Sequence, residues 1–188
     1  MTIGIIIGSI AGYYGGRVDN VLCRLIDVLM CIPTFFLILT VNAFLKPNIL
    51  TVMVVIGLFG WMGIARLVRG QMLSLREQEF IEAARAIGVS DMRIVFRHLL
   101  PNALAPAIVA ATMGVANAIL TESSLSYLGM GVQEPTPSWG SMLRAGQTYF
   151  TSAPWLAIFP GILISITVLA FNFVGDGLRD ALDPRLNQ

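Results

Sequence analysis

The stretch WLAIFPGILISITVLAFNFV, residues 155–174, runs for twenty residues without a charged side chain. At a rise of about 1.5 Å per residue, a helix of this length is about 30 Å long, which matches the hydrocarbon core of a bilayer. Residues 25–45 and 49–68 are similar apolar windows, with one charged residue each. Residues 103–120 form a fourth window, which is uncharged and rich in small side chains. These four windows predict membrane-spanning helices.

The composition agrees with this class. Of 188 residues, 56% are hydrophobic and 12% are charged, and the mean hydropathy is +0.77. Soluble domains are about a quarter charged, and proteins that bind nucleic acid need basic patches, which a net charge of +1 does not suggest. We therefore predict an all-α, polytopic transmembrane bundle of about five spans. Pro33, Pro106 and Pro160 lie within these spans, where each is able to kink its helix.

The first apolar segment, residues 1–11, is too short to span a bilayer by itself. It resembles the second half of a helix, so we expect it to be a partial first span. Glycines recur at four-residue intervals, at Gly4, Gly8, Gly12 and Gly16. In lipid, small residues at this spacing allow helix backbones to approach closely. We favour such packing for Gly4 and Gly8, and a turn for Gly15 and Gly16.

The cationic residues predict an orientation, because cytoplasmic segments carry an excess of Lys and Arg. If residues 70–98 are cytoplasmic, alternation of the spans places ten cations inside and two outside. The inside set is Arg17, Arg24, Arg66, Arg69, Arg76, Arg85, Arg93, Arg97, Arg179 and Arg185, and the outside set is Lys46 and Arg144. The C-terminus is then cytoplasmic.

The long inside loop has a helical pattern of its own. Over residues 75–87, Phe80, Ala84 and Ile87 share one stripe, and Glu82 lies off it. Gly88 follows directly, at the position where helices often end in a left-handed residue.

A second helix is expected to follow this glycine. Ser90 is a suitable N-cap. Asp91 lies in the first turn, where its negative charge interacts favourably with the positive end of the helix dipole. The predicted apolar stripe of this helix is Met92, Val95, Phe96 and Leu99, and Pro101 is expected to mark its boundary with the next span.

Two interpretations of this helix–glycine–helix loop remain. It could be an amphipathic hairpin on the membrane surface, although such helices are usually basic on their polar face. Its charge is mixed instead, and the small pair Ala83 and Ala84 adjoins Glu82. Small residues beside a charge suit a knob that enters a groove on another protein.

The segment EAARAIGVSDMRIVFRHLLPN resembles the EAA loop of binding-protein-dependent ABC importer permeases. That pattern is E-A-A, three residues, G, nine residues, I, one residue and L-P. Here the matching residues are Glu82, Ala83, Ala84, Gly88, Leu100 and Pro101. His98 stands at the isoleucine position, and a histidine there is familiar in the dipeptide and oligopeptide branch.

Other stretches also resemble this branch, among them GYYGGRVDNVLCRLIDVLM, SYLGMGVQEPTPSWGSML and FNFVGDGLRDALDPRL. Together they are similar to the C-type subunit of dipeptide, oligopeptide and nickel importers over almost all of residues 1–188. The resemblance implies one permease domain that lacks the family's usual N-terminal part, so we expect a fragment or a misplaced start. It favours peptides as the cargo and leaves nickel, glutathione and other small solutes open.

The resemblance also implies a mechanism. In that family the coupling loop, here residues 70–101, docks in a cleft of a cytoplasmic ATP-binding subunit, and closure of the ATPase pair moves two permease subunits between inward-facing and outward-facing states. Glu82 would make polar contacts with the ATPase, and Ala83 and Ala84 would allow close approach. Gly88 would supply the turn, and Leu100 and Pro101 would join the loop to the following span. The implied partners are ATP-binding subunits, a second permease in a heterodimer and an extracytoplasmic solute-binding protein.

The chain itself is not expected to hydrolyse ATP. A phosphate-binding loop needs G-x-x-x-x-G-K-[ST], and the sole lysine, Lys46, follows leucine. Neither a metal site nor a bound cofactor is expected, because the only histidine is His98 and no Cys or His cluster exists. Cys23 and Cys31 would lie about 12 Å apart on one helix, too far for a disulfide.

Residues 122–154 form an external connection too long for a simple turn. It could contact a solute-binding protein, or it could be an interfacial helix anchored by Trp139, Tyr149 and Trp155. Glu122 ends the fourth apolar window, and near the outer interface we favour a structural hydrogen-bonding role for it. Asn172 is open to the same two interpretations, structural or functional.

Two other functional classes compete with an importer subunit. An ion-coupled secondary transporter or channel would be expected to show inverted repeats and charges buried in mid-span, and only Asp27 lies near the start of a span. A membrane scaffold without transport activity is the third class. Recovery of an ATPase subunit with the chain discriminates among them.

Overall fold

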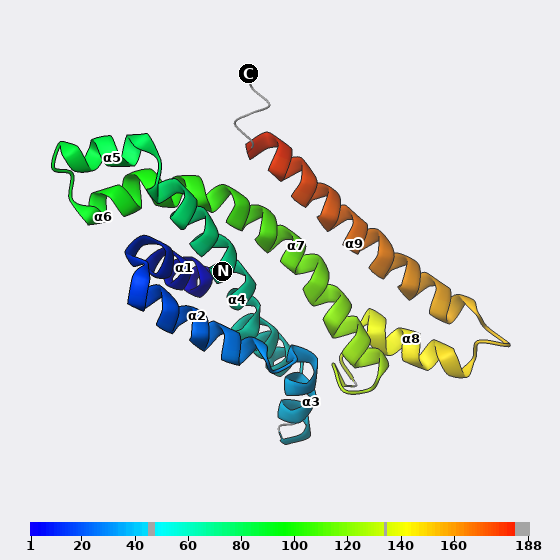
Figure 1. The fold of residues 1–188 in the computed structure, drawn as a ribbon. Helices are drawn as coiled ribbons and strands as arrows, with labels where there is room; N and C mark the ends of the chain where they lie inside the picture. The colour runs from blue at the N-terminus through cyan, green and yellow to red at the C-terminus, as the bar shows by residue number, and fades with distance from the viewer. Residues whose placement is uncertain (45–47, 134, 183–188) are drawn as a thin grey trace. The chain divides into compact units, whose positions relative to one another are not determined.

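The structure is a computed structural model that describes residues 1–44, 48–133 and 135–182. In these ranges the chain is helical and contains no strand, which confirms the predicted all-α class (Figure 1). The elements, in chain order, are α1 Thr2–Tyr14, α2 Gly16–Met30, α3 Thr34–Phe44, α4 Ile49–Arg76, α5 Glu79–Ala86, α6 Asp91–Ile94, the π-helix η1 Val95–Leu99, α7 Leu100–Tyr127, α8 Trp139–Thr148 and α9 Trp155–Leu182.

The number of spans agrees with the sequence. Within the described residues, three helices are long and apolar enough to cross a membrane: α4, α7 (continuous with α6 and η1) and α9. The pair α2 and α3 passes the same test together but is bent by 64°. The shorter apolar helix α1 stands where the partial first span was predicted, so the described residues contain three or four candidate spans and this partial one, against about five predicted.

The long helices extend beyond their apolar windows. α4, α7 and α9 have 28 residues each, so each is about 42 Å long against a hydrocarbon core of about 30 Å. The predicted windows correspond to the apolar part of each helix and not to its full length. The limits of the windows were set where the hydropathy falls, whereas the backbone hydrogen bonds of each helix continue into the polar residues beyond.

The predicted span over residues 25–45 is not one straight helix. α2 ends at Met30 and α3 begins at Thr34, with Pro33 between them. Proline has no N–H to donate and disfavours a helical conformation in the residue before it, which accounts for the break. Pro106 and Pro160 lie inside α7 and α9, which continue through them.

The chain forms two compact units, which are described separately. Unit 1 comprises Met1–Cys31, Gly60–Ala111 and Leu178–Gln188, and unit 2 comprises Ile32–Phe59 and Thr112–Gly177. Nine of the ten cations in the described residues fall in unit 1, and Arg144 falls in unit 2. Lys46 and Arg185 lie outside the described residues. Nine of the ten cations predicted inside therefore lie in unit 1, and one of the two predicted outside lies in unit 2.

In unit 1, glycines of α1 lie directly against the backbone of α4. A Cβ added at Gly4 would be 2.6 Å from the Trp61 carbonyl oxygen, and one at Gly8 would be 2.5 Å from that of Ala65. Gly12 continues the same contact, since a Cβ there would be 2.5 Å from the Met72 Cβ. The predicted packing face is confirmed, and it includes Gly12. Gly15 and Gly16, with φ of 65° and 53°, form the predicted turn into α2.

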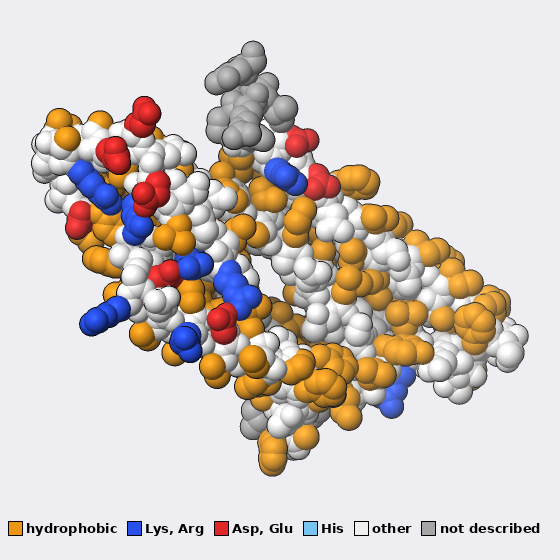
Figure 2. Space-filling view, in the orientation of Figure 1, with side chains coloured by type: hydrophobic (Ala, Val, Ile, Leu, Met, Phe, Trp, Pro, Cys, Tyr) orange, Lys and Arg blue, Asp and Glu red, His pale blue; other side chains and the backbone are white. Residues whose placement is uncertain are grey.

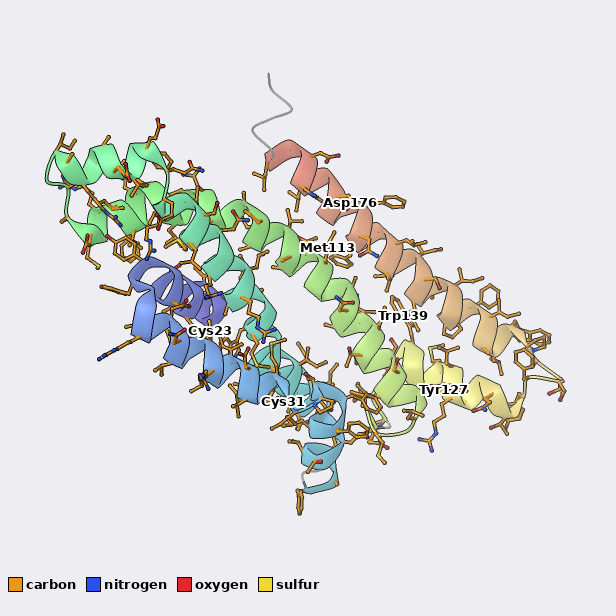
Figure 3. All side chains as sticks on the ribbon, in the orientation of Figure 1. Cys23, Cys31, Met113, Tyr127, Trp139 and Asp176 are labelled. Carbon is orange, nitrogen blue, oxygen red and sulfur yellow. The ribbon has the colours of Figure 1, made fainter. Side chains whose placement is uncertain are left out.

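Two ion pairs join α2 to α4 in unit 1. Arg69 binds both carboxylate oxygens of Asp19, which is buried, and Arg66 binds Asp27, which is exposed. Cys23 donates to Asp19 Oδ1 at 3.2 Å. Figure 3 shows Cys23 within α2 and Cys31 at its end, and both are free thiols.

Unit 2 holds a second core and an ordered corner at the end of α7. Ile38, Val52, Val55 and Leu125 form the core. The Ser126 hydroxyl donates to Glu122 Oε1 at 2.6 Å and accepts from the Val132 N–H at 3.0 Å. These bonds support the structural role predicted for Glu122. Further along residues 122–154, α8 begins with a reciprocal capping box between Ser138 and Ser141.

Candidate functional site: the coupling loop

The charged loop forms a compact helical hairpin at one end of unit 1. α5 and α6 lie beside each other in Figure 1, and Figure 2 shows acidic and basic side chains gathered over them and over α2. Within the predicted residues 70–101, the first seven residues still belong to α4. The hairpin proper is therefore α5, the turn at Gly88, α6 and η1.

One face of the hairpin is part of the core of unit 1. Ile81, Ile94 and Leu99 are fully buried and Ala84 is 8% exposed. They share a cluster with side chains of α1, α4 and α7: Tyr13, Val68, Met72, Ala103 and Ala107. Burial of large aliphatic side chains contributes about 1.5–3 kcal/mol each, so the loop is fixed firmly to the helices beneath it.

The buried stripe differs from the predicted one. Of the residues expected to share an apolar face, Ala84 and Leu99 are buried and Val95 is half-buried. Phe80, Ile87, Met92 and Phe96 are instead exposed, by 43%, 81%, 65% and 60%. Ile81 and Ile94, which were not predicted, take the inward positions.

The π-helix η1 explains the shift in the second helix. Hydrogen bonds from i to i+5 widen the turn, so residues five apart come to lie near one face. Ile94 and Leu99 are five apart and both are buried, whereas an α-helical period pairs Leu99 with Val95 and Phe96. The predicted boundary at Pro101 is also wrong, because α6, η1 and α7 form one continuous helix from Asp91 to Tyr127. Pro101 occupies the second position of α7, after the π-helical turn.

The turn between the two helices matches its prediction. Gly88 has φ of 80°, the Gly88 N–H donates to the Arg85 carbonyl at 2.9 Å, and the Val89 N–H donates to the Ala84 carbonyl at 3.1 Å. This pair of bonds is the Schellman motif, which satisfies the last carbonyls of a helix. Ser90 is the N-cap residue of α6, as predicted, although its side chain makes no capping hydrogen bond.

We expect Gly88→Val to disrupt the hairpin, and Gly88→Asn to be much milder. No atom lies within 4 Å of a Cβ built at Gly88, so the cost is conformational, and a β-branched residue is strongly disfavoured at positive φ whereas Asn tolerates it. Limited proteolysis within residues 79–94 measures the effect. Equal protection of the valine and asparagine variants would contradict this explanation.

The six motif residues do not share one surface. Glu82 and Ala83 are exposed on α5, whereas Ala84 faces the core. Gly88 is exposed at the turn, and Leu100 (half-buried) and Pro101 (exposed) open α7. The structure thus brings Glu82 and Ala83 to the outer face and gives Ala84 an internal packing position.

The outer face of the hairpin combines apolar and charged side chains. Phe80, Ile87, Met92 and Phe96 are exposed in the hairpin, and so are Glu79, Glu82, Arg93 and Arg97. We call these eight residues, with Ala83, the outer face. Exposed large apolar residues among charges are typical of a protein-binding surface, and mixed charge is less typical of a membrane-surface helix.

Comparison with known proteins identifies the family. The model of the family described as binding-protein-dependent transport system inner membrane component matches residues 4–188. The dipeptide transport system permease protein DppC of Alkalihalophilus pseudofirmus is 45% identical over 183 residues, which cover 97% of this chain and 60% of the relative. The oligopeptide transport system permease protein OppC of Bacillus subtilis is 42% identical over 188 residues, covering 100% and 62%.

A third relative, OppC of Escherichia coli K12, is 48% identical over 171 residues, which cover 91% of this chain and 57% of the relative. The chain therefore spans about 60% of the length of the curated relatives it matches. A solved structure of the MetNI methionine ABC transporter in inward-facing conformations has the same fold, with a TM-score of 0.59 and 22% identity over 96% of this chain and 88% of that one. The chain belongs to the family of inner-membrane components of binding-protein-dependent transport systems.

Proposed function

We propose that the protein is a permease subunit of an ATP-driven importer, and that its coupling loop binds a separate cytoplasmic ATP-binding subunit. The observation that carries the proposal is the two-sided hairpin. Its inner face is buried in the core of unit 1, and its outer face exposes apolar and charged side chains. A loop that is fixed on one side and open on the other is suited to transmit force from a partner to transmembrane helices.

The nucleotide chemistry then belongs to the partner. The only lysine of the chain, Lys46, follows leucine, so the sequence contains no G-x-x-x-x-G-K-[ST] loop. Glu82 and Ala83 are the motif residues on the outer face, and we assign them the contact with the ATPase. Ala84 acts from the core side, where a larger side chain would push α5 away from the helices beneath it.

The same proposal includes the orientation and the other partners. The ten-to-two distribution of cations supports a cytoplasmic coupling loop and a cytoplasmic C-terminus. Residues 122–154 would then face the opposite side, where a solute-binding protein would bind. A second permease subunit would complete the pathway, and membrane lipid would cover the apolar side chains that α9 exposes along its length (Figure 2).

For the cargo, we propose peptides. Two of the relatives are oligopeptide permeases by name and one is a dipeptide permease. A further relative, 44% identical over 186 residues, is the glutathione transport system permease protein GsiD of Pectobacterium atrosepticum, and glutathione is itself a tripeptide. The shared chemistry is a short peptide with free charged groups.

Reconstitution tests this function. Proteoliposomes would contain the chain with its second permease and ATP-binding subunits, and solute-binding protein and labelled dipeptide, pentapeptide or glutathione would be added. We expect uptake of at least one peptide that requires ATP hydrolysis and persists when ionophores remove ion gradients. Uptake driven by an ion gradient without ATP would show that the chain belongs to a secondary transporter.

A further inference from the structure

Tyr13, the residue before the last in α1, makes three polar contacts with the region of the coupling loop. Its hydroxyl donates to Asp91 Oδ1 at 2.5 Å, and the Arg85 guanidinium carbon lies 5.9 Å from the centre of its ring. The Tyr13 carbonyl accepts from Arg76 Nη1 at 3.1 Å. The side chain is 7% exposed and belongs to the core of unit 1. One residue of α1 thus contacts α5, α6 and the end of α4.

These contacts join segments that are far apart along the chain. Asp91 follows Tyr13 by 78 residues, whereas α5 is linked to α4, and α6 to α7, by the chain itself. A hydrogen bond to a carboxylate is stronger than a neutral one, and its short length fits a charge-assisted bond. Tyr13 therefore joins α1 to the hairpin, which α1 does not adjoin along the chain.

The turn after Tyr14 connects α1 directly to α2. α1 ends at Tyr14 and α2 begins at Gly16, with Gly15 and Gly16 both at positive φ. A Cβ added at Gly15 would be 2.7 Å from Arg76 Nη1, so the turn lies against the end of α4. Such a short, packed turn leaves little room for α2 to move independently of Tyr13.

We propose that Tyr13 is a positioning residue that transmits movement of the coupling loop into α1 and α2. This inference depends on the proposed function, because only a driven loop has movement to transmit. With Tyr13 in place, the hairpin, the end of α4 and the α1–α2 turn move as one body. Without its hydroxyl, α1 and α2 remain joined to α4 by the glycine contacts and the Asp19–Arg69 pair, but the hairpin loses its hydrogen bond to α1 and is able to shift relative to α1 and α2.

Tyr13→Phe removes the hydroxyl with its hydrogen bond to Asp91 and its electrostatic interaction with Arg85, while the ring, its core packing and the ring face near Arg85 are retained. Tyr14→Phe is the matched control, since Tyr14 is adjacent and 62% exposed. In the assembled transporter we expect the ratio of peptide imported to ATP hydrolysed to fall about threefold or more for Tyr13→Phe. For Tyr14→Phe we expect no change. A purely structural role would lower the yield of complex and leave this ratio unaltered.

A distance measurement provides the second readout. Spin labels on cysteines replacing Val21 in α2 and Ala86 in α5, which is exposed and not part of the outer face, report in a Cys23→Ser and Cys31→Ser background whether the two helices move together. We expect the distance to stay constant on addition of a non-hydrolysable ATP analogue in the parent protein, and to change in Tyr13→Phe. If Tyr13→Phe does not assemble, Asp91→Asn weakens the same bond from the loop side and is judged by the same readouts.

The outcomes separate this inference from the proposed function. If the parent transporter imports peptide with ATP, and Tyr13→Phe shows the same ratio and the same distances, the inference is wrong and the function stands. If the parent chain retains no ATP-binding subunit, the proposed function itself is wrong.

Discussion

Arg69→Met is expected to destabilise the protein far more than Arg66→Met. Arg69 holds both oxygens of Asp19, which is 8% exposed, so its loss leaves a buried carboxylate with no cationic partner and only the weak hydrogen bond from the Cys23 thiol. Breaking a buried ion pair in this way costs about 3–5 kcal/mol, which for a chain of this size corresponds to a fall in melting temperature on the order of 10 °C. Thermal unfolding in detergent, followed by tryptophan fluorescence, measures it.

Arg66 supplies the matched control. It pairs with Asp27 between the same two helices, but the side chains are 48% and 58% exposed. Exposed pairs contribute about 0–1 kcal/mol, so Arg66→Met should change the melting temperature little. The double replacement Asp19→Leu with Arg69→Met should recover part of the loss, because no unpaired charge remains. Equal losses for the two arginine variants would contradict the assignment of Asp19–Arg69 as the bond that joins α2 to α4.

Glu82→Lys is expected to reduce the amount of ATP-binding subunit that co-purifies with the chain by about tenfold or more. Reversing a charge at a contact residue weakens complementarity by about 1.4 kcal/mol or more, which is tenfold in affinity. Glu82 is exposed and outside the core of unit 1, so insertion and the melting temperature of the chain should not change. Quantitative immunoblotting of affinity-purified membranes gives the ratio of the two subunits.

Glu79→Lys is the control for Glu82→Lys. It introduces the same change of charge on the same short helix, one turn earlier and outside the E-A-A motif. We expect its effect to be several-fold smaller. If transport and assembly both survive Glu82→Lys, the role assigned to Glu82 is wrong.

Local rules predicted much of the fold from the sequence. Windows of about twenty residues with at most one charge predicted the spans, and the spacing of Gly4 and Gly8 predicted the face of α1 that packs on α4. The turn at Gly88 was predicted because a glycine directly after a helical pattern commonly ends the helix. Each of these features depends on side chains close together in the sequence.

The inward face of the loop could not be predicted in the same way. Both stripes were drawn with the period of an α-helix, and η1 changes that period between Ile94 and Leu99. The choice between Phe80 and Ile81 as the buried residue of α5 depends on which direction the helix faces. That direction is determined by the core it packs against, which no local pattern reveals.

The polar contacts between distant segments were also missed. Asp19 and Arg69 are 50 residues apart, and Tyr13 and Asp91 are 78 apart. In the sequence Arg69 is simply one more arginine of the set predicted to be cytoplasmic, and Tyr13 is an aromatic residue before a glycine turn. Only the packing of α1 and α2 against α4 and the loop gives them partners.

Crosslinking from Ala83 tests the central claim most directly. Ala83→Cys, in a background of Cys23→Ser and Cys31→Ser, places a single reactive thiol on the outer face of α5, and Thr136→Cys serves as the control in residues 122–154. A short bifunctional reagent applied to membranes of the assembled transporter should join Ala83→Cys to a protein that carries a G-x-x-x-x-G-K-[ST] loop, identified by mass spectrometry. Thr136→Cys should not form this adduct. Failure of Ala83→Cys to form it, or formation of the same adduct from Thr136→Cys, would contradict the proposal that this loop binds the ATPase.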